Sequence, residues 1–161
     1  MTGVQTCALP IWWRLLRAVW KFSRGTGDVP PLQESFRSVP FATLEQPFGG
    51  LTPDQDELFT RYFRVKIQGL HFCGPAYYDI PFVEGFYSLM LVMPVTMWIA
   101  HWLAAGEGRS QHSTNDVQQA LAIVDHHHGY SPALGQSAAR SRVRSLVMSQ
   151  DLPRLMLRYC R

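Results

Sequence analysis

Apolar residues recur at helical intervals along the second half of the chain. The clearest stripe repeats every three or four residues and comprises Val117, Ala120, Leu121 and Val124. Because residues at this spacing share one face of an α-helix, the stripe predicts an amphipathic helix. Ser113 or Thr114 is expected to cap its start, with Asp116 in the first turn. Gly129 is expected to end it.

Other helices are predicted on both sides of this one. One begins after Thr52, with Pro53 at its first position, and continues to about Gly69. Its first turn carries acids that complement the helix dipole, namely Asp54, Asp56 and Glu57. Further helices are predicted over residues 134–148 and from Asp151 to Tyr159. No segment shows the alternation of apolar and polar residues that predicts a β-strand. We therefore expect an all-α fold, an irregular helical bundle with one apolar central helix, over residues 54–161.

The most apolar segment, residues 82–105, is expected to be the central helix of this bundle. No charge occurs from Gly85 to Ala100, and Glu84 and His101 bound the run. A transmembrane helix needs about 20 apolar residues, so this run is short for one. Pro94 lies inside it and predicts a kink or a restart. A buried central helix is therefore favoured, and a membrane span is the alternative.

The N-terminal third has a different pattern. Residues 12–24 predict an amphipathic helix, with Arg14, Arg17, Lys21 and Arg24 on one face. Such a helix either docks on the protein or lies on a membrane surface. Residues 25–53 are rich in proline and glycine and predict an irregular connection. Residues 1–11, MTGVQTCALPI, read codon for codon as a sequencing-library adapter. We therefore expect a fragment whose native start is missing, and Cys7 is set aside.

Composition narrows the function classes. The net charge is only +3, but six arginines and one acid, Asp151, lie between residues 133 and 161. These C-terminal arginines are interpreted as the solvent-exposed face of a helix. No nucleic-acid partner is expected, and anionic lipid is the alternative. Cys73 and Cys160 are too few for a disulfide framework or a four-cysteine zinc site. A cytoplasmic location is expected.

The most conspicuous candidate site is a run of an acid and three histidines, Asp125, His126, His127 and His128. With His71, these residues are the candidate ligands of a transition metal. Adjacent helical residues point about 100° apart, so they need a further element to converge. In the structural alternative, His128 enters the core, while His126 and His127 bond the last carbonyls of the helix.

Two further pairs were considered as reactive sites. His71 and Cys73 could form a nucleophilic pair, but no group that would orient the base is identifiable. Asp79 and Glu84 could act as paired carboxylates. Glu84 is more often a helix-dipole partner or half of an ion pair with an arginine. The sequence contains no phosphate-binding loop, dinucleotide fingerprint, nucleophile elbow or zincin motif.

Several segments occur in a familiar order: RYFRVKIQGLHFCG (61–74), PFVEGFYSLMLVMPVTMWIAHWLA (81–104), STNDVQQALAIVDHHHGYSP (113–132) and DLPRLMLRY (151–159). This order resembles the C-terminal helical half of bacterial YkgJ-type cysteine-cluster proteins, which include flagellin lysine-N-methylase-like proteins. The resemblance implies an upstream cysteine set that holds zinc or an iron–sulfur cluster. This chain lacks that set, and no family ligand transfers to its residues.

Two functions follow as expectations. The first is the helical portion of a metal-cluster protein with protein-lysine methylase-like activity. It would be inactive as this fragment and carry no cofactor here, and its partners would be the missing N-terminal domain and a protein substrate. The second is a non-catalytic helical binding or membrane-peripheral protein. Whether the chain is an enzyme stays open.

Overall fold

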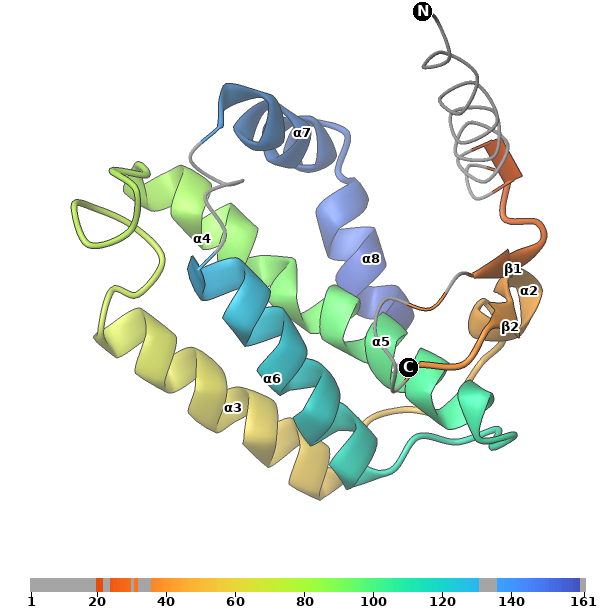
Figure 1. The fold of residues 1–161 in the computed structure, drawn as a ribbon. Helices are drawn as coiled ribbons and strands as arrows, with labels where there is room; N and C mark the ends of the chain where they lie inside the picture. Colours follow the sequence, from red (N-terminus) through yellow and green to blue (C-terminus); the bar gives the residue numbers. More distant parts are fainter. Residues whose placement is uncertain (1–19, 22–23, 30, 32–35, 131–135, 160–161) are drawn as a thin grey trace, which may run out of the picture.

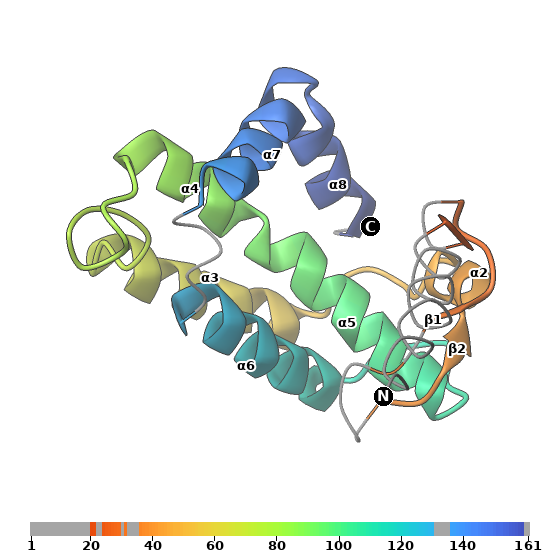
Figure 2. The same ribbon diagram turned by 45° about the horizontal axis from the view of Figure 1, so that its top comes forward.

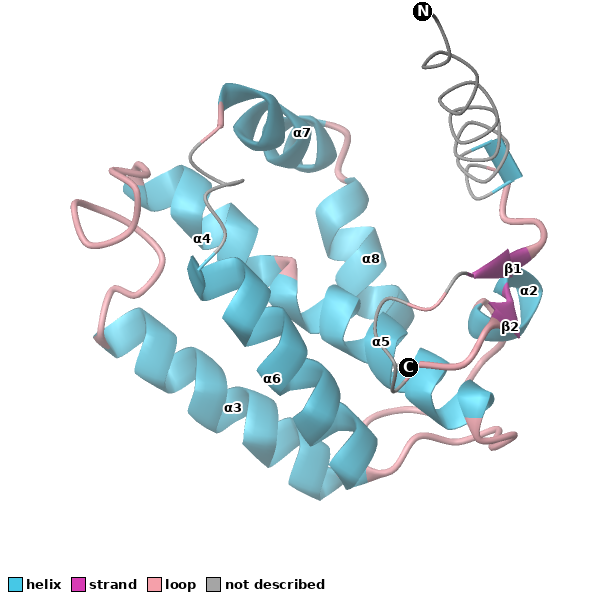
Figure 3. Cartoon of the chain, viewed as in Figure 1, coloured by secondary structure: helices cyan, strands magenta, loops and turns pink. Residues whose placement is uncertain are grey.

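The computed structural model describes residues 20–21, 24–29, 31, 36–130 and 136–159, and the side chains of residues 128–130 are not described. The fold is all-α, with one small two-stranded sheet in the described part (Figure 3). This confirms the expected fold class. Most of the amphipathic helix predicted over residues 12–24, and all of residues 1–11, lie outside the described residues.

The connection predicted to be irregular contains short regular elements. β1 (Asp28–Val29) pairs antiparallel with β2 (Val39–Pro40), and α2 (Phe41–Leu44) follows directly. Val29, Val39 and Leu44 are buried in the core, so this segment folds against the helices. The structure thus adds three short regular elements to the irregular connection predicted over residues 25–53. Each element is too short to produce a readable period among the surrounding glycines and prolines.

α3 (Pro53–Gln68) begins where the sequence predicts. The Thr52 side chain accepts a hydrogen bond from the Gln55 backbone, and the Gln55 side chain accepts one from the Thr52 backbone at 3.0 Å. This reciprocal capping box satisfies two amides that have no partner within the helix. Pro53 needs no such partner, because proline has no N–H.

The apolar segment forms two helices, α4 (Phe82–Met90) and α5 (Val92–Gly106). The break lies at Leu91, three residues before Pro94, where a kink or a restart was predicted. Pro94 is the third residue of α5, a position whose N–H has no intrahelical partner, so proline is tolerated there. A continuous helix would instead drive its ring against the carbonyl of Met90, four residues earlier. The helix therefore restarts before the proline.

α5 is the central helix of the fold. Met97, Ala100 and Trp102 are almost fully buried, which confirms the predicted apolar core helix. Within the described residues, only the stretch Phe82–Gly106 is long and apolar enough to cross a membrane, and 61% of its most apolar window is buried inside the protein. Core helices meet the same length and composition test, so this is weak grounds for a membrane span.

The remaining helices lie on two sides of α5 (Figures 1 and 2). α6 (Thr114–Tyr130) packs along it, and α3 packs on α6. The predicted stripe of α6 is buried: Val117, Ala120, Leu121 and Val124. α6 ends at Tyr130, one residue beyond Gly129, where the sequence predicts its end. On the other side, α7 (Ser137–Met148) contacts α4, and α8 (Asp151–Tyr159) contacts α5.

Candidate functional site

The predicted metal ligands differ in their surroundings: three of the histidines are exposed to solvent, and Asp125 forms an ion pair. His71 is exposed after the end of α3, and His126 and His127 are exposed on α6 with ring centroids 5.7 Å apart. The His128 side chain lies outside the described residues. Among the residues that the structure describes, no three or more histidine, cysteine or acidic side chains are placed to share a metal ion.

Asp125 has a structural role between α6 and α3. Its carboxylate accepts a hydrogen bond from the Tyr62 hydroxyl at 2.8 Å and pairs with Lys66 Nζ at 2.6 Å. Burial and this hydrogen bond raise the pKa of Tyr62 far above its ordinary value. Tyr62 therefore stays a hydrogen-bond donor, and Asp125 serves to join the two helices.

The residues of the other two candidate pairs have different surroundings. Glu84, in the first turn of α4, pairs with Arg144 and lies 3.9 Å from Arg140, both on α7. This agrees with the interpretation of Glu84 as a partner of arginine. Cys73 is half-buried, whereas His71 is exposed.

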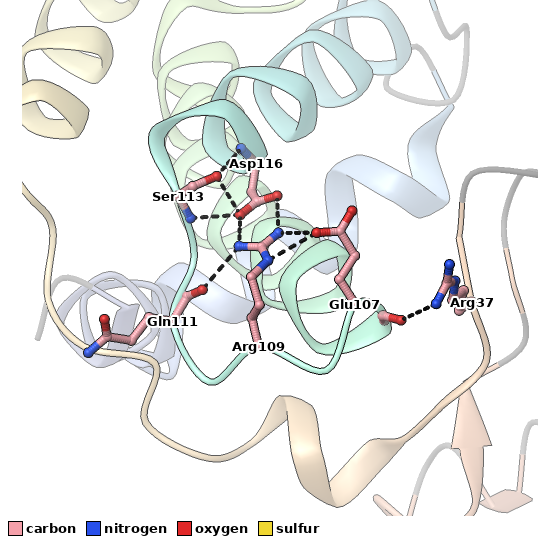
Figure 4. Close-up of polar contacts among 7 residues, drawn as sticks. Arg37, Glu107, Arg109, Gln111, Ser113 and Asp116 are labelled. Atoms are coloured by element: carbon pink, nitrogen blue, oxygen red, sulfur yellow. Dashed lines mark hydrogen bonds and ion pairs between the residues drawn. The ribbon is translucent and has the colours of Figure 1, made fainter.

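A polar network that sequence reasoning missed organises the loop between α5 and α6 (Figure 4). Arg109 donates from Nη1 and Nη2 to both carboxylate oxygens of Asp116, at 2.7 and 2.8 Å. It also donates from Nε and Nη2 to Glu107 Oε2, at 3.0 and 2.7 Å. The Ser113 backbone donates to Asp116 at 2.6 Å, and Ser113 Oγ accepts from the Asp116 backbone at 3.2 Å. Ser113 therefore caps α6, as one of the two expected residues.

The charges of this network are already satisfied internally. Burial opposes ionisation of Asp116, but the hydrogen bonds from Arg109 and Ser113 outweigh it and lower its pKa. An adjoining cleft of about 540 Å³ is also lined by Arg37, Trp102 and Gln119. Arg37 donates to the Gly106 carbonyl at 3.4 Å. Because Arg109 faces two carboxylates, the arrangement holds the loop in place and offers little free positive charge to an anion.

A second pocket lies between α5, α8 and the segment that follows α2, and a buried histidine, His101, lines it. Its volume is about 290 Å³, and its walls include Phe48, His101, Arg158 and Tyr159. The His101 ring stacks on the Phe48 ring, with their centroids 4.4 Å apart. It makes an edge contact with the His112 ring, with their centroids 5.2 Å apart. His101 is 5% exposed and His112 8%. We call His101 and His112 the histidine pair.

Burial keeps the histidine pair neutral. It lowers the pKa of His101 to about 4, and the neighbouring His112 adds to this effect. The Leu44 backbone acts in the opposite direction and raises the pKa of His101. Its contact with the ring is not a hydrogen bond. Burial also lowers the pKa of His112. Both nitrogens of His101 and Nε2 of His112 lack a hydrogen-bond partner among the described residues. Perturbed titratable groups in a pocket are a common sign of a functional site.

A third feature is an exposed apolar surface on α4. Phe82 is 57% exposed, Val83 56% and Phe86 37%. The Phe82 and Phe86 rings are parallel within 4°, and Phe72 packs beneath them with centroids 5.4 and 6.1 Å away. We call Phe82, Val83 and Phe86 the α4 face. It adjoins the loop that joins α3 to α4, at the left edge of Figure 1.

Comparison with known proteins adds no relationship to these observations. No protein family model matches the chain, and no curated protein or solved structure matches it.

Proposed function

We propose that this chain is a helical binding protein that attaches peripherally to anionic membrane surfaces through the α4 face. The observation that carries the proposal is the exposure of two adjacent phenylalanine rings and a valine on the first two turns of one helix. Single exposed apolar residues are ordinary on protein surfaces, but contiguous groups often mark interaction sites.

The α4 face is held in place by the residues beneath it. Gly85 lies directly against the backbone of Phe72, and a Cβ added there would stand 1.9 Å from the Phe72 oxygen. This close contact fixes the loop after α3 against α4. Phe82 and Phe86 are also parallel and share Phe72 as a base. A surface that is ordered before binding loses less conformational entropy when it binds.

The charge of α7, which packs against α4, favours lipid as the occupant. Arg140 and Arg144 of α7 share the single carboxylate of Glu84, which leaves a net positive charge on this pair of helices. Arg142 is exposed on α7 as well. Arginines on a protein that presents an apolar surface are attracted to anionic lipid headgroups.

The resemblance to cysteine-cluster proteins leads to a separate proposal, that the chain is the helical portion of a metal-cluster protein. A cysteine set encoded upstream of Trp12 would support that proposal and would leave the membrane proposal unchanged.

Vesicle flotation tests the proposal. The protein is mixed with vesicles of phosphatidylcholine containing phosphatidylserine, and with vesicles of phosphatidylcholine alone. The exposed parts of Phe82 and Phe86 together equal roughly one whole side chain, so their burial contributes about 2 kcal/mol. Phe82→Gln with Phe86→Gln is therefore expected to weaken binding to anionic vesicles about 30-fold.

The matched control is Met148→Gln. Met148 is 85% exposed at the end of α7 and lies outside the α4 face, so its replacement is expected to leave binding unchanged. Circular dichroism checks that all variants fold. Equal binding of the double variant and the wild type, or no flotation of the wild type, would refute the proposal. Dimerisation that the double variant abolishes, without flotation, would instead identify a second copy as the occupant.

A further inference from the structure

The histidine pair presents three buried nitrogens that need a partner. A buried polar atom without a hydrogen bond is costly, commonly by an amount comparable to the bond itself. Nδ1 and Nε2 of His101 and Nε2 of His112 are all in this condition. A neutral imidazole has one N–H and one lone pair, so each ring offers one nitrogen as an acceptor or as a metal ligand.

The centroid spacing of the two rings matches that of two ligands of a single ion. Their centroids lie 5.2 Å apart, and their planes are inclined by 62°. Two imidazoles bound to one tetrahedral ion, with metal–nitrogen bonds of about 2.0 Å, place their centroids about 5 Å apart. The rings come from different elements, because His101 lies in α5 and His112 in the loop before α6. Such a pair can bind one ion from two directions, which three consecutive residues on one helix cannot.

The surroundings of the pair include a pocket of about 290 Å³, which His101 lines and His112 does not. A pocket of this volume has room for water molecules on the His101 side of the pair. The stacked Phe48 ring fixes the orientation of the His101 ring. The only acids near the pair are occupied, since Glu45 pairs with Arg158 and Asp116 with Arg109 in the described part of the chain. The ligand set is thus two imidazoles and water.

We propose that His101 and His112 together bind one divalent transition-metal ion that prefers imidazole ligands, Zn²⁺ or Cu²⁺. The inference is independent of the membrane proposal, since the histidine pair and the α4 face share no residue. It also differs from the site predicted from the sequence, because His71 and residues 125–128 take no part in it.

Isothermal titration with Zn²⁺ alone tests the site. The wild type is expected to bind one ion per chain, with a rise in melting temperature on binding. His101→Gln and His112→Gln are each expected to weaken binding more than about 10-fold, because each removes a ligand. The matched control, His126→Gln with His127→Gln, removes two exposed histidines and is expected to leave affinity unchanged.

Three results would overturn the inference. If the wild type fails to bind Zn²⁺, water alone satisfies the buried nitrogens. If the control variant loses binding and the His101 variant retains it, the ion binds at the exposed histidines. If all variants bind alike, neither pair is the site.

Pulsed electron paramagnetic resonance of Cu²⁺ bound to the control variant gives an answer that does not depend on the folding of buried variants. Coupling to two imidazoles is expected, and coupling to one or none would contradict the site.

Discussion

The close contact between α4 and the preceding loop leads to a sharp prediction for Gly85→Ala. An added Cβ would stand 1.9 Å from the Phe72 carbonyl oxygen, 2.9 Å from its carbonyl carbon and 3.2 Å from Cys73 Cβ. The nearest obstacles are backbone atoms, so no rotation of a side chain can relieve the contact. The loop or the helix must move by more than about 1 Å to restore an ordinary separation.

The expected loss of stability combines two opposing effects. Alanine is favoured over glycine within a helix by about 0.5–1 kcal/mol. Overpacking costs about 1–3 kcal/mol, and more where the backbone must move. The net effect should be a destabilisation of about 2 kcal/mol, or a fall in melting temperature of about 6 °C for a chain of this size.

Urea unfolding of Gly85→Ala and of a matched variant, Gly106→Ala, measures this difference. Gly106 is also helical, but the nearest atom to its added Cβ is Arg37 Cβ at 3.4 Å, and the Arg37 backbone nitrogen is 3.7 Å away. Gly106→Ala should therefore be neutral or slightly stabilising. If the two variants are equally stable, the loop is not fixed against α4, and the argument for an ordered α4 face fails.

Three further predictions concern buried polar groups and a helix cap, each followed by chemical unfolding. In metal-free protein, the unfolded His101 takes up a proton near pH 6.5, but the folded one does so only near pH 4. Stability should therefore be full above pH 6.5 and fall by about 3 kcal/mol as the pH drops to 4, and a pH-independent wild type would contradict this. Asp116→Asn should cost about 2 kcal/mol, since Arg109 loses its buried partner but is partly hydrated, and an unchanged midpoint would argue against the network. Thr52→Ala should cost about 1 kcal/mol and Thr52→Ser almost nothing; equal losses would mean that the hydroxyl does not cap α3.

Local signals in the sequence located the helix starts well. Thr52 and Ser113 both cap helices where their neighbours predicted, because a cap depends on residues within one turn. The core stripe of α6 was also readable, since helical periodicity is local. The restart predicted at Pro94 occurs at Val92. Its position could not be read from the sequence, because a proline in a first turn and one inside a helix look alike until the helix start is known.

The candidate sites could not be read from the sequence in the same way. The sequence places His101 at the end of an apolar run, yet the residue is buried within α5 among residues from distant segments, Phe48 and Tyr159. Helical periodicity involves only residues close in sequence, so it cannot reveal a contact between distant segments. Asp125 drew attention as part of a histidine run, but its role depends on Lys66 and Tyr62 of a separate helix.

The proposal that the α4 face binds anionic membranes is tested most directly by hydrogen–deuterium exchange with and without phosphatidylserine vesicles. The first amides of a helix have no intrahelical acceptor and exchange quickly unless they are covered. The account predicts that vesicles slow exchange over residues 82–84 and leave α8 unchanged. Unaltered exchange over residues 82–84, or protection confined to α8, would contradict it.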